Sequence, residues 1–421
     1  MVKHPASGWR NHYDANNVSA QEAVALVRQG DHIYIPAPAG PRTANMVLAL
    51  LPRLEELAPI TISALPAFDL SWYTEEMAKL VNIHVMFAAP NSRGVVNDHR
   101  ADFRPWMVWA GHRAANEGRP GARALDVAMV AVSPPNAHGY CCFGASLWDQ
   151  KKVALEARLT LAAVDATMPA TFGDTWIHVS DIDKFVAVDP FRPPDLPVPV
   201  VETWEPAIAA NVRELIRDGD TVQFGLGSTT AAVVREGALN AREDLAYWGE
   251  LTVPGIVDLV KAGVITGERS RTHPNTFIAT SAGNSSMDLE FIAGNPRFEF
   301  YPPDYVHNPK VISANDNMVA INNALAVDLT GQIAAGEFGY RTWSGTGGQF
   351  AFAMGAFMSE GGRSITVLPA TAVGGTKSRI VGQFEPGQIV TVPRDIADFV
   401  VTEYGVASLI NKSQRERVDE M

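Results

Sequence analysis

The sequence contains almost no cysteine. Among 421 residues the only two cysteines are the neighbours Cys141 and Cys142. Adjacent thiols cannot form a disulfide framework, and they lack the paired spacing of a zinc site or the signature of a catalytic thiol. We therefore expect reduced thiols, as in a cytoplasmic protein.

Long apolar runs and an excess of positive charge are also missing. No uninterrupted apolar run approaches the roughly 18 residues that suggest a membrane span, and residues 1–17 lack the apolar core of a signal peptide. The formal net charge is −12 and the pI is about 5.3, which disfavours a nucleic-acid or anionic-membrane surface. We expect a soluble cytoplasmic protein that binds neither.

Several common site motifs are absent as well. The ten histidines are scattered and show no HxxxH or HExxH spacing, so we predict no metal site. The sequence also lacks a GxxxxGK[ST] phosphate loop, the GxGxxG dinucleotide fingerprint and the GxSxG elbow of serine hydrolases.

What is present is typical of a globular protein, with 47% hydrophobic and 19% charged residues. A chain of this length favours two domains, and alternating strand and helix patterns favour mostly parallel sheets. LVRQGDHIYI (26–35) aligns with LIRDGDTVQF (215–224) at an offset of 219 − 30 = 189 residues. We therefore predict two related α/β domains, 1–190 and 201–421. The segment 189–200 contains five prolines and would form the connector.

Several elements can be predicted individually. Ser19 and Glu22 form a capping box, and the following helix is expected to end at Gly30. We also predict a helix over 151–161 and two β-rich runs, IVTVPRD (389–395) and FVVTEYGVASL (399–409). A second, looser parallel between 125–144 and 318–339 supports the duplication.

The chemistry is expected in the stretch 225–261. A strand leads into the glycine turn GLGSTT (225–230), and a second strand, LAYWGEL (245–251), delivers Glu250. In open α/β sheets ligands bind outside the carboxyl ends of strands, so we interpret Glu250 as a nucleophile facing an oxyanion and cofactor loop. The simpler alternatives are a turn that needs glycine only for positive φ and a structural carboxylate. For Glu403, a core or capping role is expected.

A further glycine-rich loop, SGTGGQ (344–349), precedes the apolar helix FAFAMGAFM. Together these motifs resemble the class I coenzyme A-transferases, in particular the acetyl-CoA hydrolase/transferase branch with 4-hydroxybutyrate and succinyl-CoA:acetate CoA-transferases. The resemblance covers nearly the whole chain. It is carried by SPPNAHGY, MPATFGDTWIHVSDID, LIRDGDTVQFGLG, GELTVPGIVDLVKAGVIT, NNALAVDLTGQIAAGEF, SGTGGQFAF, SRIV and VVTEYGVASL, in that order.

The resemblance implies a fold, a mechanism and a set of site residues. The fold would be two open-sheet domains of the sugar-phosphate-isomerase-like superfamily. Glu250 would attack an acyl-CoA to give a mixed anhydride and then a glutamyl-CoA thioester, in a ping-pong cycle completed by an acceptor acid. Coenzyme A would be a substrate, with no permanently bound cofactor, and the protein would be a homodimer or larger. The backbone N–H groups of Leu226 and Gly348 would stabilise the oxyanions. Residues expected to line the CoA channel are Gly225, Gly227, Ser228, Thr229, Leu325, Ser344 and Gly347.

The chain departs from the family pattern at several positions. Ala351 replaces an expected Asp, Val373 stands where a CoA-contacting Lys is expected, and Trp248-Gly249 precedes the nucleophile. Trp248 could therefore shape an unusual acyl site. The donor and acceptor acids stay open. An acyl-CoA hydrolase, a sugar-phosphate isomerase with Glu250 as base, and a non-catalytic ligand sensor are the alternatives.

Overall fold

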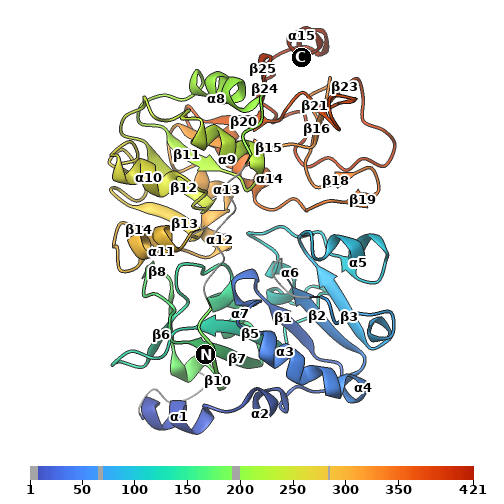
Figure 1. The fold of residues 1–421 in the computed structure, drawn as a ribbon, viewed down its shortest axis with the longest axis vertical. Helices are drawn as coiled ribbons and strands as arrows, with labels where there is room; N and C mark the ends of the chain where they lie inside the picture. Colours follow the sequence, from blue (N-terminus) through green and yellow to red (C-terminus); the bar gives the residue numbers. More distant parts are fainter. Residues whose placement is uncertain (1–7, 65–69, 192–199, 283–284) are drawn as a thin grey trace. The chain divides into compact units, whose positions relative to one another are not determined.

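The computed structural model describes residues 8–64, 70–191, 200–282 and 285–421 (Figure 1). The chain divides into two compact units. Unit 1 comprises Met1–Trp106, Ala110–Arg192 and Phe300–Pro302, and unit 2 comprises Met107–Trp109, Pro193–Glu299 and Pro303–Met421. Most of the predicted connector, 189–200, lies outside the described residues.

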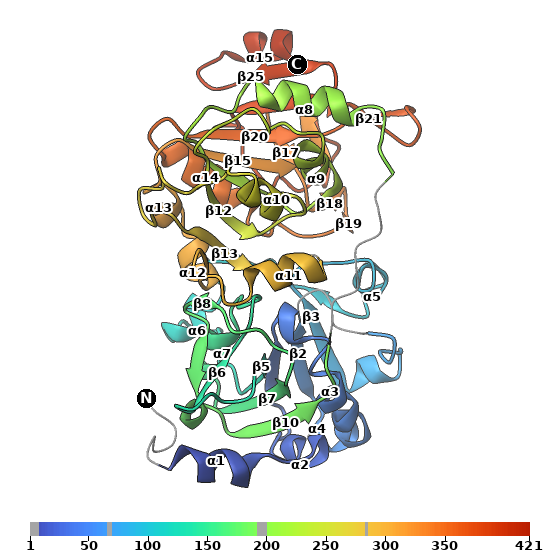
Figure 2. The same ribbon diagram turned by 60° about the vertical axis from the view of Figure 1, so that its left-hand side comes forward.

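Unit 1 is built on a parallel seven-stranded sheet in the order β10-β7-β5-β1-β2-β3-β4. These strands are β1 His32–Ile35, β2 Ile60–Ala64, β3 Val81–Val85, β4 Asp102–Phe103, β5 Val127–Val132, β7 Leu159–Asp165 and β10 Lys184–Val188. The short strands are β6 Tyr140–Cys142, β8 Phe172–Gly173 and β9 Trp176–His178. Its helices are α1 Trp9–Asn16, α2 Ala20–Val24, α3 Ala44–Leu50, α4 Leu54–Leu57, α5 Arg93–Asn97, α6 Arg113–Asn116 and α7 Gln150–Glu156. Figure 2 shows α1 and α2 alongside β10.

The sheet of unit 2 has the order β25-β24-β20-β15-β11-β12-β13-β14. From β24 to β13 the strands are parallel, and β25 is antiparallel to β24. The strands are β11 Thr221–Phe224, β12 Ala246–Leu251, β13 Phe277–Ser281, β14 Phe298–Phe300, β15 Met318–Asn323, β20 Arg363–Val367, β24 Phe399–Thr402 and β25 Gly405–Ser408.

Helices and small strands complete unit 2. The helices are α8 Glu205–Arg213, α9 Ser228–Arg235, α10 Ile256–Lys261, α11 Ser286–Ile292, α12 Pro303–Val306, α13 Pro309–Ile312, α14 Gln349–Met358 and α15 Gln414–Glu420. The small strands are β16 Ala326–Asp328, β17 Ile333–Ala334, β18 Glu337–Phe338, β19 Arg341–Thr342, β21 Thr371–Ala372, β22 Lys377–Ser378 and β23 Ile380–Val381. None of the helices in the described residues is long and apolar enough to cross a bilayer.

The predicted fold class is confirmed, and the repeat appears residue by residue. β1 begins at His32 and β11 at Thr221, which is the same offset of 221 − 32 = 189 residues. Gly30 and Gly219 have φ angles of 78° and 79°. In both copies the Asp that follows accepts the N–H of an Arg three residues earlier, at 2.9 Å for Asp31 and 2.7 Å for Asp220. The GD turn is therefore the same local structure in both units.

Each sheet reverses its direction of winding at one point. In unit 2 the chain passes from β11 to β12 in one direction and from β15 to β20 in the other. Since crossovers between parallel strands are almost always right-handed, the two connections cover opposite faces. The carboxyl ends of β11 and β15 therefore form a topological switch point, where open α/β sheets bind ligands.

Three element predictions need correction. The helix predicted over 151–161 ends at Glu156, because the apolar run from Leu159 forms the buried strand β7. IVTVPRD forms no regular strand, and within 389–395 only Val392 makes an isolated bridge. The next residue is Pro393, which has no N–H to continue a ladder. The capping box at Ser19 is present, but α2 already ends at Val24.

Candidate functional site

Glu250 lies near the carboxyl end of β12, between β11 and β13. Side chains alternate along a strand, so Trp248 and Glu250 share one face of the sheet. The segment that follows β14, with α12 and His307, packs on β12. Trp248 is 1% exposed, whereas the Glu250 side chain is 21% exposed. Along β12 the side chains on this face therefore change from buried at Trp248 to partly exposed at Glu250.

One oxygen of Glu250 contacts a fully buried histidine. Nε2 of His307 lies 2.9 Å from Oε2 of Glu250, and the His307 side chain has 0% exposure. An ionised carboxylate can only accept hydrogen bonds, so Nε2 carries the proton and donates it. The His307 ring packs edge-on against Phe352, with ring centroids 5.2 Å apart. The orientation of the carboxylate is therefore set from inside the core.

Gly348 packs directly against the contact between Glu250 and His307. A Cβ at position 348 would lie 2.5 Å from Glu250 Oε2 and 2.6 Å from His307 Cδ2, so a methyl group does not fit. Gly348 is the N-cap residue of the ten-residue helix α14. A helix N-terminus favours negative charge, and here it lies beside the carboxylate. The structure therefore brings together Glu250 and Gly348, two of the three predicted catalytic residues.

Trp248 is hydrogen-bonded to the backbone of the segment 305–307, which contains His307. Its Nε1 donates to the carbonyl oxygen of Val306 at 2.9 Å, and the indole packs against the rings of His273 and Tyr305 at 5.7 and 5.6 Å. His273 Nε2 is 2.8 Å from the Tyr305 hydroxyl. Trp248 therefore acts on the site through the backbone of residues 305–307. Its contribution to acyl preference stays a prediction.

The predicted glycine loop after β11 is anchored to the end of β15. Asn323 Nδ2 donates to the Leu226 carbonyl at 3.2 Å, and its Oδ1 accepts the Thr230 N–H at 3.1 Å. Gln349 Nε2, in the first turn of α14, donates to the Asn323 carbonyl at 3.0 Å. Asn323 thus joins the loops of Leu226 and Gly348 at the switch point.

The side chains of Asn322 and Asn323 leave no room for a Cβ at Gly225 and Gly227. A Cβ on Gly225 would lie 2.4 Å from Asn322 Oδ1, and one on Gly227 would lie 2.1 Å from Asn323 Nδ2. Gly227 has a φ of 162°, which is ordinary extended backbone. Close approach, rather than positive φ, is therefore the physical reason for glycine at position 227.

A groove of about 1530 Å³ opens beside the start of α9. Ser228 and Thr229, both predicted to bind CoA, line it together with Arg235, Val373 and Arg379. Arg235 pairs with Glu205, and Arg379 Nη1 lies 3.4 Å from the Ala324 carbonyl. The groove therefore combines a helix start and two guanidinium groups, which favour an anionic ligand, with the carboxylates of Glu202, Glu205 and Asp258, which oppose one.

The remaining predicted residues lie around these loops. Leu226 is 63% exposed, and the Leu325 N–H donates to the Ala334 carbonyl at 2.8 Å. Ser344 Oγ donates to the Ala335 carbonyl at 3.1 Å, and Gly347 has a φ of 53°. At the expected Asp position, Ala351 is 2% exposed in α14.

Sequence reasoning missed His307 and Asn323. Asn323 ends the apolar run of β15, and a polar residue at a strand end is a signal that was available. No spacing pattern points to His307, because its partner is 57 residues away.

The other candidate groups have contacts of their own. Cys141 and Cys142 are free and buried, and burial raises the pKa of the Cys141 thiol to about 12. Glu403 Oε2 accepts the Ala370 N–H at 2.8 Å. Burial lowers the pKa of Arg379, which lines the groove, and the negative charge of Glu403 opposes this effect. The structural role expected for Glu403 stays a prediction. Within the described residues, no group of three or more His, Cys, Asp or Glu side chains could hold a metal ion.

The chain as a whole has counterparts in one protein family. The chain belongs to the acetyl-CoA hydrolase/transferase family, whose N-terminal domain model matches residues 2–202 and whose C-terminal domain model matches residues 285–421. It is 36% identical to the 4-hydroxybutyrate coenzyme A transferase of Clostridium kluyveri, over 97% of this chain and 94% of that protein.

Two further relatives are similar over nearly the whole chain. The succinyl-CoA:cyclohexane-1-carboxylate CoA transferase of Geobacter metallireducens is 35% identical, over 99% of this chain and 93% of that one. The crystal structure of RipA from Yersinia pestis superposes with a TM-score of 0.87 at 29% identity, covering 97% of this chain and 94% of that chain. The predicted family is therefore confirmed.

Proposed function

We propose that the protein transfers coenzyme A between an acyl-CoA and a free carboxylic acid, with Glu250 as the nucleophile. The observation that carries the proposal is the Glu250 carboxylate itself. It is partly exposed at a strand end, and Oε2 is oriented by His307 at 2.9 Å. The names of the relatives, which are CoA transferases, support the same reaction type.

The proposed cycle proceeds through two covalent intermediates. Oε1 of Glu250 attacks the thioester carbonyl, and the CoA thiolate leaves, which gives an acyl–glutamyl anhydride. The thiolate then attacks Cδ of Glu250 and expels the acyl carboxylate, which leaves a glutamyl-CoA thioester. A second acid reverses these steps and receives CoA. A carboxylate suits this role because the anhydride is reactive enough to re-form a thioester, and one hard step is divided into two.

The groove supports the CoA part of the proposal. Ser228 and Thr229 form the start of α9, where backbone N–H groups favour phosphate oxygens. Val373 cannot supply the charge of the expected Lys. In our proposal Arg379, which lines the same groove, supplies a guanidinium instead.

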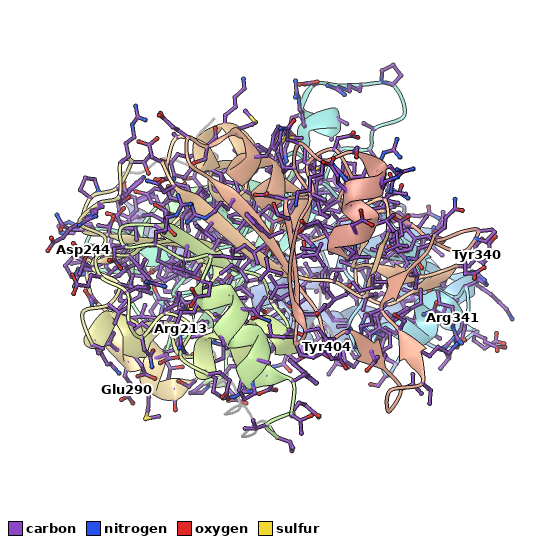
Figure 3. The ribbon with its side chains drawn as sticks, turned by 90° about the horizontal axis from the view of Figure 1, so that it is seen from above. Arg213, Asp244, Glu290, Tyr340, Arg341 and Tyr404 are labelled. Atoms are coloured by element: carbon purple, nitrogen blue, oxygen red, sulfur yellow. The ribbon has the colours of Figure 1, made fainter. Side chains whose placement is uncertain are left out.

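The test is the intact mass of the protein after incubation with acyl-CoA and no acceptor. A panel of acetyl-, propionyl-, butyryl-, 4-hydroxybutyryl- and succinyl-CoA should include a donor that leaves a CoA-sized adduct on the Glu250 peptide. Glu250→Gln should form none. Glu290→Gln, at an exposed position on α11 (Figure 3), should form it normally. Folded wild-type protein that forms no adduct with any donor would rule out the covalent cycle.

Hydrolysis is a second candidate activity, because the family includes acetyl-CoA hydrolases by its description. Water would then replace the acceptor acid at the glutamyl-CoA stage. Turnover measured with and without added carboxylate separates the two. A transferase should convert the donor acyl-CoA into the acyl-CoA of the added acid and release no free CoA, whereas a hydrolase should release free CoA continuously without an added acid.

We also propose a cytoplasmic homodimer or larger assembly without a permanently bound cofactor. Light scattering gives the assembly, and cell fractionation gives the compartment. The mass of the native protein shows whether a cofactor is retained.

A further inference from the structure

We propose that His307 is a catalytic hydrogen-bond donor to the oxyanion that forms on Glu250 itself. This inference rests on the proposed function, because it assigns a role within the glutamyl-CoA cycle. It goes beyond the backbone N–H groups of Leu226 and Gly348 by adding a side-chain donor.

The geometry assigns different roles to the two oxygens of Glu250. Oε2 is held by His307 Nε2 at 2.9 Å, which leaves Oε1 as the attacking oxygen. Once Oε1 has formed the anhydride, Oε2 is the carbonyl oxygen of the glutamyl group. His307 therefore already lies within hydrogen-bonding distance of the atom on which negative charge next develops.

The covalent step balances without a proton transfer. The CoA sulfur forms a bond to Cδ, and the electron pair of the C=O π bond moves onto Oε2. The oxyanion accepts the hydrogen bond from His307 Nε2–H. When the C=O bond re-forms, the Cδ–Oε1 bond breaks, and Oε1 leaves with the acyl carboxylate, so the thioester now carries Oε2. The same N–H serves the carboxylate, the anhydride and the thioester, and His307 remains in one tautomer throughout.

The surroundings of His307 prepare this donor before the reaction. The side chain is fully buried, its backbone N–H bonds the Pro303 carbonyl at 2.9 Å, and its ring packs against Phe352. The preceding carbonyl, of Val306, accepts from Trp248. A donor fixed in a low-dielectric site needs no reorganisation as charge develops, and it stabilises that charge more than it would in water.

The experiment compares His307→Leu with His307→Gln. Leu fills the space without a donor, whereas the terminal amide of Gln can replace Nε2–H. We expect His307→Leu to lower kcat by about 10²–10³, as for other oxyanion donors, with the KM for acyl-CoA changed less than about threefold. His307→Gln should recover at least about a tenth of the wild-type kcat. His307→Met, a second apolar replacement that adapts to irregular gaps, serves if His307→Leu does not fold.

Two controls separate this role from a structural one. Phe298→Leu removes a buried aromatic contact with Phe277 in the same unit without changing a residue that touches His307, and should keep kcat within about fivefold. The rate of glutamyl-CoA formation in a single turnover should fall in His307→Leu as kcat does. A folded apolar variant with kcat within threefold of wild type, or equal losses in the apolar and Gln variants, would overturn the inference. Failure of the proposed function looks different, because then the wild-type protein itself forms no adduct.

Discussion

At the scale of single residues, the site depends on one atom, Oε2 of Glu250. It contacts the buried His307 side chain, and Gly348 leaves no room there for a methyl group. The proposed mechanism needs a carboxylate at position 250, whereas a steric limit accounts for the absence of a side chain at position 348. These are different physical reasons, and substitutions can separate them.

Gly348→Ala should abolish most activity while Glu250 is still present. The added Cβ would lie 2.5 Å from Oε2, so the carboxylate or the start of α14 must shift. Because small misplacements of reacting groups cost about 10²-fold in rate, we expect kcat to fall by at least that factor, measured in a CoA-transfer assay. Gly382→Ala is the matched control, since nothing lies within 4 Å of its added Cβ. Equal activity of both variants would contradict the steric argument.

At the scale of elements, the site depends on how β11, β15 and α14 are joined. Asn323 connects the Leu226 loop to the end of β15, and Gln349 connects α14 to the same residue. By contrast, the hairpin β18–β19 and the β24–β25 turn project into solvent. Figure 3 shows Tyr340 and Tyr404 at the surface, where they are 86% and 83% exposed. The base of the β18–β19 hairpin nevertheless contacts the SGTGGQ loop, since the Ser344 N–H donates to the Gly336 carbonyl at 2.8 Å.

Asn323→Ala should loosen the Leu226 loop. The Leu226 carbonyl and the Thr230 N–H would each lose a partner. An unsatisfied buried group costs about 1–3 kcal/mol, and exposure of these loops to solvent reduces that cost. We expect a decrease of about 1 kcal/mol in the free energy of unfolding, measured by urea denaturation. We also expect kcat/KM for acyl-CoA to fall at least about tenfold, because the Leu226 N–H, which is predicted to stabilise an oxyanion, would be displaced. A kcat/KM within twofold of wild type would argue against the anchoring role.

At the scale of the whole molecule, the two units repeat one ion pair with different burial. In unit 2 Arg363 pairs with Asp220, and the side chains are 8% and 2% exposed. In unit 1 Arg158 pairs with Asp31 at 2.7 Å, and the side chains are 35% and 8% exposed. The Arg lies at the start of β20 in unit 2 and just before β7 in unit 1.

Asp220→Ala should therefore destabilise the protein more than Asp31→Ala. Removing one partner of a buried pair leaves an uncompensated charge and costs about 3–5 kcal/mol. The partly exposed Arg158 can still be hydrated, so we expect Asp31→Ala to cost no more than about half of that. Guanidinium unfolding of both variants gives the comparison. A larger loss for Asp31→Ala would contradict the ranking.

The stability of unit 2 should also depend on Asp398. Burial raises the pKa of Asp398 from 3.8 to about 6, against smaller opposing effects of the Ser364 N–H and of Arg363. Between these values the unfolded chain releases the proton while the folded protein keeps it. Folding stability therefore decreases as pH rises from about 4 to 6, and the full penalty remains above about 6.

Asp398→Asn removes this titration. The free energy of unfolding of the variant minus that of the wild type should be larger at pH 7.5 than at pH 4.5, as measured by denaturant unfolding at both pH values. A difference between the two proteins that does not change with pH would contradict the assignment.

Much of this organisation could be predicted from the sequence, because it depends on local patterns. The GD turns, the strand carrying Glu250 and the glycine loops follow from strand patterning, φ requirements and a repeat of 189 residues. IVTVPRD was wrongly predicted to be β-rich. Its apolar alternation does not reveal that pairing stops at the single bridge between Val392 and Ile333, where Pro393 has no N–H to continue the ladder. The prediction that the Leu226 and Gly348 N–H groups stabilise oxyanions came from the family resemblance, because motif spacing alone does not single out these two residues.

The sequence by itself determined the fold class, the family and the candidate nucleophile, since strand periodicity and ordered motifs are properties of neighbouring residues. Only the tertiary structure decided what touches that nucleophile. His307 lies 57 residues from Glu250, and Asn323 lies 97 residues from Leu226. Such contacts form because parallel strands bring distant segments to the same edge of a sheet, and no local pattern in the sequence records which side chains then meet.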